Sequence, residues 1–164
     1  MNNHCIVVAD GSRARFFCLE DVPAPEIQGG PNLTEVNDLV NPEKEAHESQ
    51  LFSDSKSGGN RTNGQGVHGY EDHRERQLAE HDRRFAKSVA ETAAELARKH
   101  GANKLLLVAR DRTLGMLRDE FEALERSGMQ VNELHKDLSK LSANELQEVL
   151  AKEKLVPKRA SPLS

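Results

Sequence analysis

The chain has 164 residues and a formal net charge of -4, and its many charged residues (30%) and few aromatic ones (4%) indicate that part of it lies outside a core. This length fits one domain, and the acidic balance argues against a protein that binds nucleic acid over its whole surface. No apolar run approaches the roughly 18 residues of a membrane span, and no signal peptide is recognisable. We therefore expect a cytoplasmic protein without membrane contact.

The amino-terminal part predicts a β-hairpin followed by a third strand. Residues 4–9 and 14–19 are apolar runs, and the turn-forming sequence Asp10-Gly11-Ser12 separates them. Cys5 and Cys18 would lie on the paired strands, where buried reduced thiols are favoured over a disulfide. Residues 33–40 alternate between apolar and polar side chains, which is typical of a half-exposed edge strand.

Residues 41–70 predict a long flexible loop, because they include the sequence SGGNRTNGQG and few apolar residues. Loops of this length are usually functional or disordered, and a surface loop without any task is the alternative. The loop is not a P-loop, because Gln65-Gly66 stands where that motif needs a lysine and a hydroxyl residue. A dinucleotide-binding GxGxxG motif is also absent, so we expect no nucleotide cofactor.

The rest of the chain predicts helices alternating with strands. Residues 71–100 form a long amphipathic pattern that Gly101 ends, and a shorter one follows from Leu114 until Gly128. Between them, residues 105–109 have no polar side chain, which indicates a strand covered on both faces. Residues 131–138 predict a last strand, Ser142 and Glu145 a capping box before a final helix, and residues 157–164 a disordered tail.

This order predicts an α/β fold with a single domain over residues 1–156. A mixed β-sheet of about five strands would contain the amino-terminal hairpin, the edge strand and two strands that alternate with helices. About three helices would cover the sheet, with the long Gly-rich loop beside it. Because helix 71–100 acts as a crossover, strand 104–109 should run parallel to one of the early strands.

Charged residues stand at the predicted strand ends, where open α/β sheets usually bind ligands. If they converge on one rim, they could hold a phosphate or a carboxylate. Arg118 could instead pair with an acidic residue on its own helix or with Asp137. Asp10 could act as an acid or base, although stabilising the turn is the commoner role of such a residue. The candidate binding residues are Asp10, Arg13, Arg110, Arg112, Arg118, Lys136 and Asp137.

The spacing of the histidines does not support a metal site. The histidines considered are His47, His68, His73, His81 and His100. No HExxH motif and no pair of histidines one helical turn apart is present. We therefore expect solvated histidines, no metal and no cofactor. Nothing in the sequence assembles a Ser/His/Asp triad either.

Four stretches of the chain resemble the bacterial host attachment protein family. They are VVADGSRARFF, the alanine-rich helix with Phe85, LLLVARDRTLGMLR and HKDLSKLSANEL, and together they cover most of the chain. The resemblance implies a protein that affects attachment to host cells. It also implies a fold similar to the middle domain of archaeo-eukaryotic peptide-chain release factors, whose Gly-Gly-Gln loop acts on peptidyl-tRNA.

The release-factor resemblance directs attention to the Gly-rich loop, where Gly58-Gly59-Asn60 and Gly64-Gln65-Gly66 replace a contiguous Gly-Gly-Gln. Gln65 is the catalytic candidate if the loop hydrolyses an ester. We favour a binding module over an enzyme. The module would contact tRNA or the ribosome through Lys56, Arg61 and the arginines at the predicted strand ends. A protein that affects surface attachment and a hydrolase are the alternatives.

Overall fold

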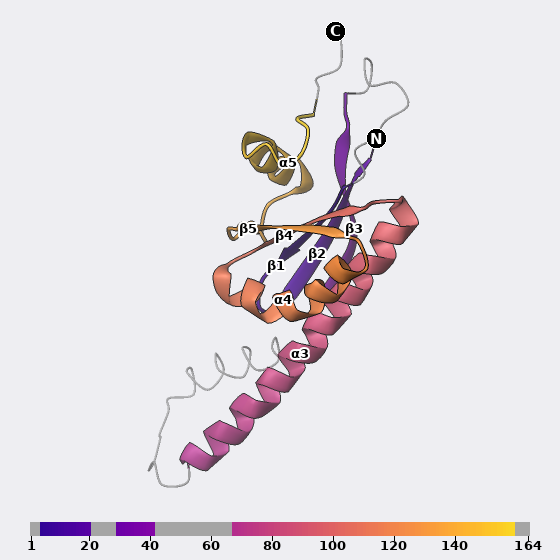
Figure 1. Ribbon diagram of the computed structural model, residues 1–164. Coiled ribbons are helices and arrows are strands. Elements are labelled where there is room, and N and C mark those ends of the chain that lie inside the picture. Colours follow the sequence, from indigo (N-terminus) through magenta and orange to yellow (C-terminus); the bar gives the residue numbers. More distant parts are fainter. Residues whose placement is uncertain (1–3, 21–28, 42–66, 160–164) are drawn as a thin grey trace.

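The computed structural model describes residues 4–20, 29–41 and 67–159 (Figure 1). The expected flexible loop therefore lies, for residues 42–66, outside the described residues. In chain order the elements are β1 (His4–Ala9), β2 (Arg13–Glu20), β3 (Asn32–Val40), α3 (Val67–His100), β4 (Lys104–Ala109), α4 (Asp111–Arg126), β5 (Gln130–His135) and α5 (Ala143–Lys152). This confirms the expected α/β fold.

Within these residues the strands form one mixed sheet in the order β3-β2-β1-β4-β5. β1 pairs antiparallel with β2 and parallel with β4, and β4 pairs parallel with β5. The crossover helix α3 thus places β4 parallel to β1, as the sequence predicts. β3 lies at one edge of the sheet, and most of its side chains are exposed or half-buried, as expected of an edge strand.

Each face of the sheet packs against its own helices, because side chains alternate along every strand. Cys5, Val7 and Ala9 of β1 belong to the core beneath α3 and α4. Ile6 and Val8 belong to the core beneath α5. Figure 1 shows the same arrangement, with α3 and α4 on one side of the sheet, α5 on the other and the amino-terminal half of α3 extending beyond the sheet.

The neighbouring strands β1 and β4 are buried on both faces of the sheet. Residues Leu105, Leu106 and Leu107 of β4 are at most 6% exposed, which confirms that this apolar run is covered from both sides. The alanines of α3 that face the sheet, such as Ala93 and Ala97, are equally buried and allow the helix to approach closely.

The three described helices end in the same hydrogen-bonded turn, in which a residue shortly beyond the helix donates to a carbonyl five residues earlier. The donors are the backbone N–H groups of Ala102, Met129 and Leu155. This Schellman arrangement needs a left-handed residue, which is Gly101 after α3 and Gly128 after α4. After α5 the left-handed residue is Lys154, with φ of 61°.

The predicted start of α3 and the predicted end of β5 are wrong. α3 begins at Val67, four residues before the predicted start. The last strand ends at His135, so that Lys136 and Asp137 lie in a loop. The Asp137 carboxylate accepts hydrogen bonds from the backbone N–H and the hydroxyl of Ser139, and this local turn replaces further strand pairing. No helix among the described residues has the length and apolar character needed to cross a lipid bilayer.

Candidate functional site

The carboxyl ends of β1, β4 and β5 meet at one edge of the sheet, because these strands run parallel. Asp10 directly follows β1, Arg110 directly follows β4, and Lys136 and Asp137 directly follow β5. We call this set of loop residues and its immediate neighbours the charged rim. The structure thus brings the candidates from three separate parts of the sequence to one edge.

Asp10 stabilises the hairpin turn. Its Oδ1 accepts hydrogen bonds from the backbone N–H groups of Ser12 and Arg13, both at 2.8 Å, and from the Ser12 hydroxyl at 3.2 Å. This Asx turn satisfies backbone donors that the tight turn would otherwise leave unpaired. Of the two roles considered for Asp10, acid or base and turn stabilisation, these hydrogen bonds show turn stabilisation.

Arg13 lies at the start of β2 and forms an ion pair with Asp38 of the edge strand β3. The Arg13 guanidinium holds the pKa of Asp38 below its ordinary value of 3.8, chiefly through their hydrogen bond. The Arg13 side chain is 55% exposed, so the pair lies in water and contributes little to stability.

Arg110 and Arg112 flank the first residue of α4. Arg110 is 75% exposed, and its Nη2 lies 3.3 Å from Oδ2 of Asp137. Hydrogen bonds from Ser139, and then the charge of Arg110, hold the pKa of Asp137 below its ordinary value of 3.8. Arg112 is exposed, and within the described part of the chain its guanidinium has no ion-pair partner.

Arg118 does not pair with either acidic partner that the sequence suggested. Two turns along α4 from Arg110, it donates from Nη2 and Nε to the two carboxylate oxygens of Glu133 in β5, at 2.9 and 3.0 Å. The hydrogen bonds and charge of Arg118 hold the pKa of Glu133 below its ordinary value of 4.5. The pair ties α4 to the outer strand of the sheet.

His135 connects this pair to the start of α4. Its Nε2 lies 3.3 Å from Glu133, and its Nδ1 contacts the carboxylate of Asp111. The sequence offered a signal for this cluster, because Glu133 and His135 are two residues apart and share one face of a strand. Sequence reasoning missed it because the partners, Asp111 and Arg118, come from a different element.

Lys136 pairs with Glu153, the residue that follows α5. Its ammonium group is therefore directed to the side of the sheet that α5 covers. The rim residues therefore do not all face one point. Within the rim, Arg110 and Arg112 are the two arginines nearest to each other in the sequence.

Arg15 is a further organising residue that the sequence did not single out. Its side chain contacts a loop from the carboxyl-terminal part of the chain. Nη1 of Arg15 donates to the carbonyl oxygens of Ser139 and Leu141, at 3.0 and 2.6 Å, and the other nitrogens bind Glu35. Arg15 thereby holds the loop between β5 and α5 against the sheet.

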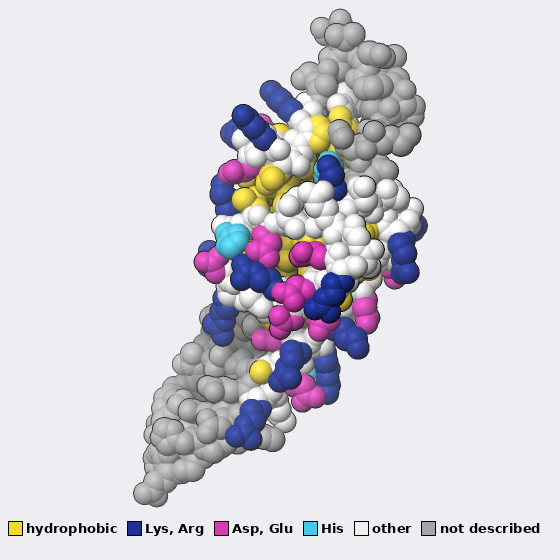
Figure 2. Space-filling model, in the orientation of Figure 1, with side chains coloured by type: hydrophobic (Ala, Val, Ile, Leu, Met, Phe, Trp, Pro, Cys, Tyr) yellow, Lys and Arg dark blue, Asp and Glu magenta, His cyan; other side chains and the backbone are white. Residues whose placement is uncertain are grey.

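The charged rim offers two kinds of hydrogen-bond donor, which are arginine side chains and backbone N–H groups. The amino-terminal end of α4 has no side-chain cap, so the backbone N–H groups of its first turn are not satisfied by a neighbouring side chain. An uncapped helix end between two arginines is suited to an anion such as a phosphate. Figure 2 shows basic and acidic side chains mixed across this side of the molecule, with no large patch of one sign.

The remaining candidates lie outside the described residues. They are the loop residues Lys56, Gly58, Gly59, Arg61, Gly64, Gln65 and Gly66. Among the residues that the structure does describe, no group of three or more histidine, cysteine, aspartate or glutamate side chains could hold a metal ion.

Comparison with known protein families finds one family whose sequence model matches most of the chain. The sequence model of a family described as protein required for attachment to host cells matches residues 5–150, which include almost all of the strands and most of α5. No curated protein matches the chain. The match covers far more than half of the chain, and the protein therefore belongs to this host attachment family.

Proposed function

We propose that the protein is a cytoplasmic binding module, related to the middle domain of release factors, that contacts tRNA or the ribosome without catalysing a reaction. The observation that carries this proposal is the uncapped start of α4 between the exposed Arg110 and Arg112. Backbone N–H groups and guanidinium groups together form the type of surface that binds backbone phosphates.

The ion pairs of the rim are compatible with this role. Exposed pairs such as that of Arg110 with Asp137 contribute only about 0–1 kcal/mol, because water solvates both partners well. A phosphate that presents several oxygens can therefore displace a carboxylate at small cost, since Arg binds phosphate through two parallel hydrogen bonds. Arg112 has no described partner to give up. Asp137, which pairs with Arg110, would repel an anion that does not bind the arginines directly.

Co-sedimentation with ribosomes at low and at moderate salt tests the proposal. We expect the wild-type protein to sediment with ribosomes at low salt and to be released as salt increases. The double variant Arg110→Ala, Arg112→Ala should lose most of the binding. Arg126→Ala is the matched control, because Arg126 is also an exposed arginine paired with a glutamate but lies at the opposite end of α4.

A second pair of variants tests the Gly-rich loop separately from the rim. Lys56→Ala with Arg61→Ala should weaken co-sedimentation if the loop contributes to the same contact. Loss with the rim variants and no change with the loop variants would restrict the proposal to the rim. Full binding by both sets of variants would refute it.

The family description supports a second candidate, an effect on attachment to host cells. Deleting the gene and measuring cell adhesion tests whether attachment depends on the protein. Cell fractionation then separates a direct role from an indirect one. A protein found only in the cytosol cannot be the adhesive contact, whereas surface-exposed protein would favour the attachment role over ribosome binding.

A further inference from the structure

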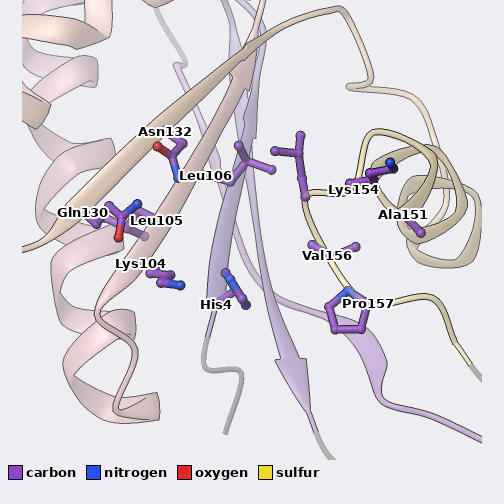
Figure 3. Close-up of a pocket in the computed structure, with 11 residues that line it drawn as sticks. His4, Lys104, Leu105, Leu106, Gln130, Asn132, Ala151, Lys154, Val156 and Pro157 are labelled. Carbon is purple, nitrogen blue, oxygen red and sulfur yellow. The ribbon is translucent and has the colours of Figure 1, made fainter.

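A cavity of about 560 Å³ lies at the opposite edge of the sheet from the charged rim. It opens where β1, β4 and β5 begin and is bounded on one side by the end of α5 and the segment that follows it (Figure 3). This volume is in the range of pockets that hold small organic molecules. No residue of the cavity belongs to the site described above.

The strand register explains the floor of the cavity. His4, Lys104 and Gln130 are direct neighbours across three parallel strands, so their side chains share one face. Two residues further along, Leu106 and Asn132 are neighbours on the same face. Leu106 belongs to the core beneath α5, which places the whole floor on the α5 side of the sheet.

The wall of the cavity is held in place by a buried glutamine. Gln147 of α5 is 3% exposed, and its Nε2 donates to the carbonyl oxygens of Pro31 and Pro157 at 2.8 and 3.3 Å. Its Oε1 accepts from the backbone N–H of Leu33 at 3.1 Å. The segment 155–157, whose residues line the cavity, is thereby fixed to α5 and to the edge strand.

The charge of the lining residues is one-sided. Lys104 and Lys154 contribute ammonium groups, and His4, Gln130 and Asn132 contribute nitrogen donors or neutral polar groups. None of the lining residues that the structure describes is acidic, although acidic residues outnumber basic ones in the chain. An apolar surface beside these groups comes from Leu106, Leu155 and Val156.

We propose that this cavity binds a small phosphate-bearing molecule. Lys104 on the strand side and Lys154 on the α5 side give the cavity a positive charge that attracts the phosphate, and Gln130 and Asn132 add amide donors beside Lys104 (Figure 3). The uncharged part of the ligand packs against Leu106, Leu155 and Val156.

Lys154 gives an independent argument, because a glycine would be more stable at its position. The same turn ends all three described helices, and α3 and α4 use glycine for the left-handed residue. A lysine there strains the backbone, since its Cβ crowds the neighbouring carbonyl. The strained residue is also one of the two lysines that line the cavity, so the structure retains a charged side chain where folding alone favours none.

Titration of the isotope-labelled full-length protein, followed by backbone amide NMR, tests the proposal. The probes are AMP, adenosine and inorganic phosphate. AMP should shift the amide resonances of Leu106, Asn132 and Leu155 with saturation. Inorganic phosphate should cause smaller shifts of the same resonances, and adenosine should cause none. Equal shifts with adenosine, phosphate binding as tight as that of AMP, or no localised shifts with any probe would overturn the proposal.

Three variants connect the shifts to the lysines. Lys104→Ala should weaken AMP binding about tenfold, since it removes one of the two lysine charges that line the cavity. Lys154→Gly should weaken binding similarly and also raise the melting temperature, because it relieves the left-handed strain. This opposite change excludes misfolding as the cause of weaker binding. Lys152→Ala, two residues earlier and absent from the cavity lining, should leave both quantities nearly unchanged. Unchanged AMP affinity in Lys104→Ala and Lys154→Gly would refute the assignment.

Discussion

At the scale of single residues, two arginines of the described part of the chain differ in exposure and in the number of groups that they contact. Arg15 is 16% exposed in its side chain and joins Glu35, two loop carbonyls and the face of Phe17, whose ring centre lies 5.0 Å from the guanidinium carbon. Arg110 is 75% exposed and contacts one acidic residue. The first kind of arginine positions the chain, and the second kind remains accessible to a ligand.

The pair of Arg118 and Glu133 predicts how stability depends on pH. The pKa of Glu133 is lowered in the folded protein, chiefly by the Arg118 hydrogen bonds, so its contribution is present above the ordinary value of 4.5. The contribution is lost as the pH falls from that value through the lowered folded pKa, where the carboxylate becomes protonated. Asp38 and Asp137, whose pKa values are also lowered, act in the same direction.

We therefore expect the melting temperature to fall as the pH is lowered below about 4.5. Glu133→Gln should melt at a lower temperature than the wild type at pH 7, and the difference should shrink as the pH falls below about 4. Thermal denaturation from about pH 7 to about pH 3 measures both effects. A constant difference between the two proteins over this range would contradict the assigned role of Glu133.

At the scale of secondary-structure elements, α4 contains a glycine that its fold does not require. Gly115 lies in the helix interior on the exposed side, and a Cβ added there meets no atom within 4 Å. Gly128, just beyond the helix, has φ of 105° and therefore a conformation that favours glycine. The two positions should respond to alanine in opposite directions.

Gly115→Ala should raise the free energy of unfolding by about 0.5–1 kcal/mol, because alanine loses less backbone entropy in a helix. Gly128→Ala should lower it by about 1 kcal/mol or more, because of the left-handed strain. Urea denaturation of the two variants and the wild type measures these changes. Destabilisation by Gly115→Ala would show that α4 packs more tightly at this point than the structure indicates.

The elements of this fold were largely predictable, whereas the partners of its charged residues were not. Local patterns such as the apolar run of β4 and the capping box at Ser142 predict an element from neighbouring residues, and both are confirmed. The end of β5 was misplaced because a turn formed by Asp137 and Ser139 competes with continued alternation. The contact of Arg118 with Glu133 depends on the docking of α4 against β5, which sequence spacing does not encode.

At the scale of the whole molecule, the fold depends on a sheet that is covered on both faces. Leu107 faces the core under α3 and α4 and has no exposed surface, and its neighbour Leu106 faces the core under α5. The charged rim and the cavity then lie at opposite ends of the same parallel strands. A ligand at one end does not compete directly with a ligand at the other.

Leu107→Ala should therefore lower the free energy of unfolding by about 2–5 kcal/mol, since it leaves a cavity between the sheet and its helices. Val40→Ala at the edge of the sheet, where Val40 is 42% exposed, should cost less than about 0.5 kcal/mol. Urea denaturation of the two variants and of the wild-type protein measures both changes in the free energy of unfolding. Similar small losses for the two variants would mean that β4 is not enclosed on both sides.

The salt dependence of tRNA binding tests the proposed function of the charged rim most directly. For wild-type protein, the logarithm of the binding constant should fall linearly with the logarithm of the salt concentration. In the double variant Arg110→Ala, Arg112→Ala the slope should decrease by about two, because each arginine that no longer neutralises a phosphate reduces it by about one, whereas Arg126→Ala should keep the wild-type slope. An unchanged slope in the double variant, or no measurable binding of either tRNA or ribosomes by the wild type at low salt, would contradict the account.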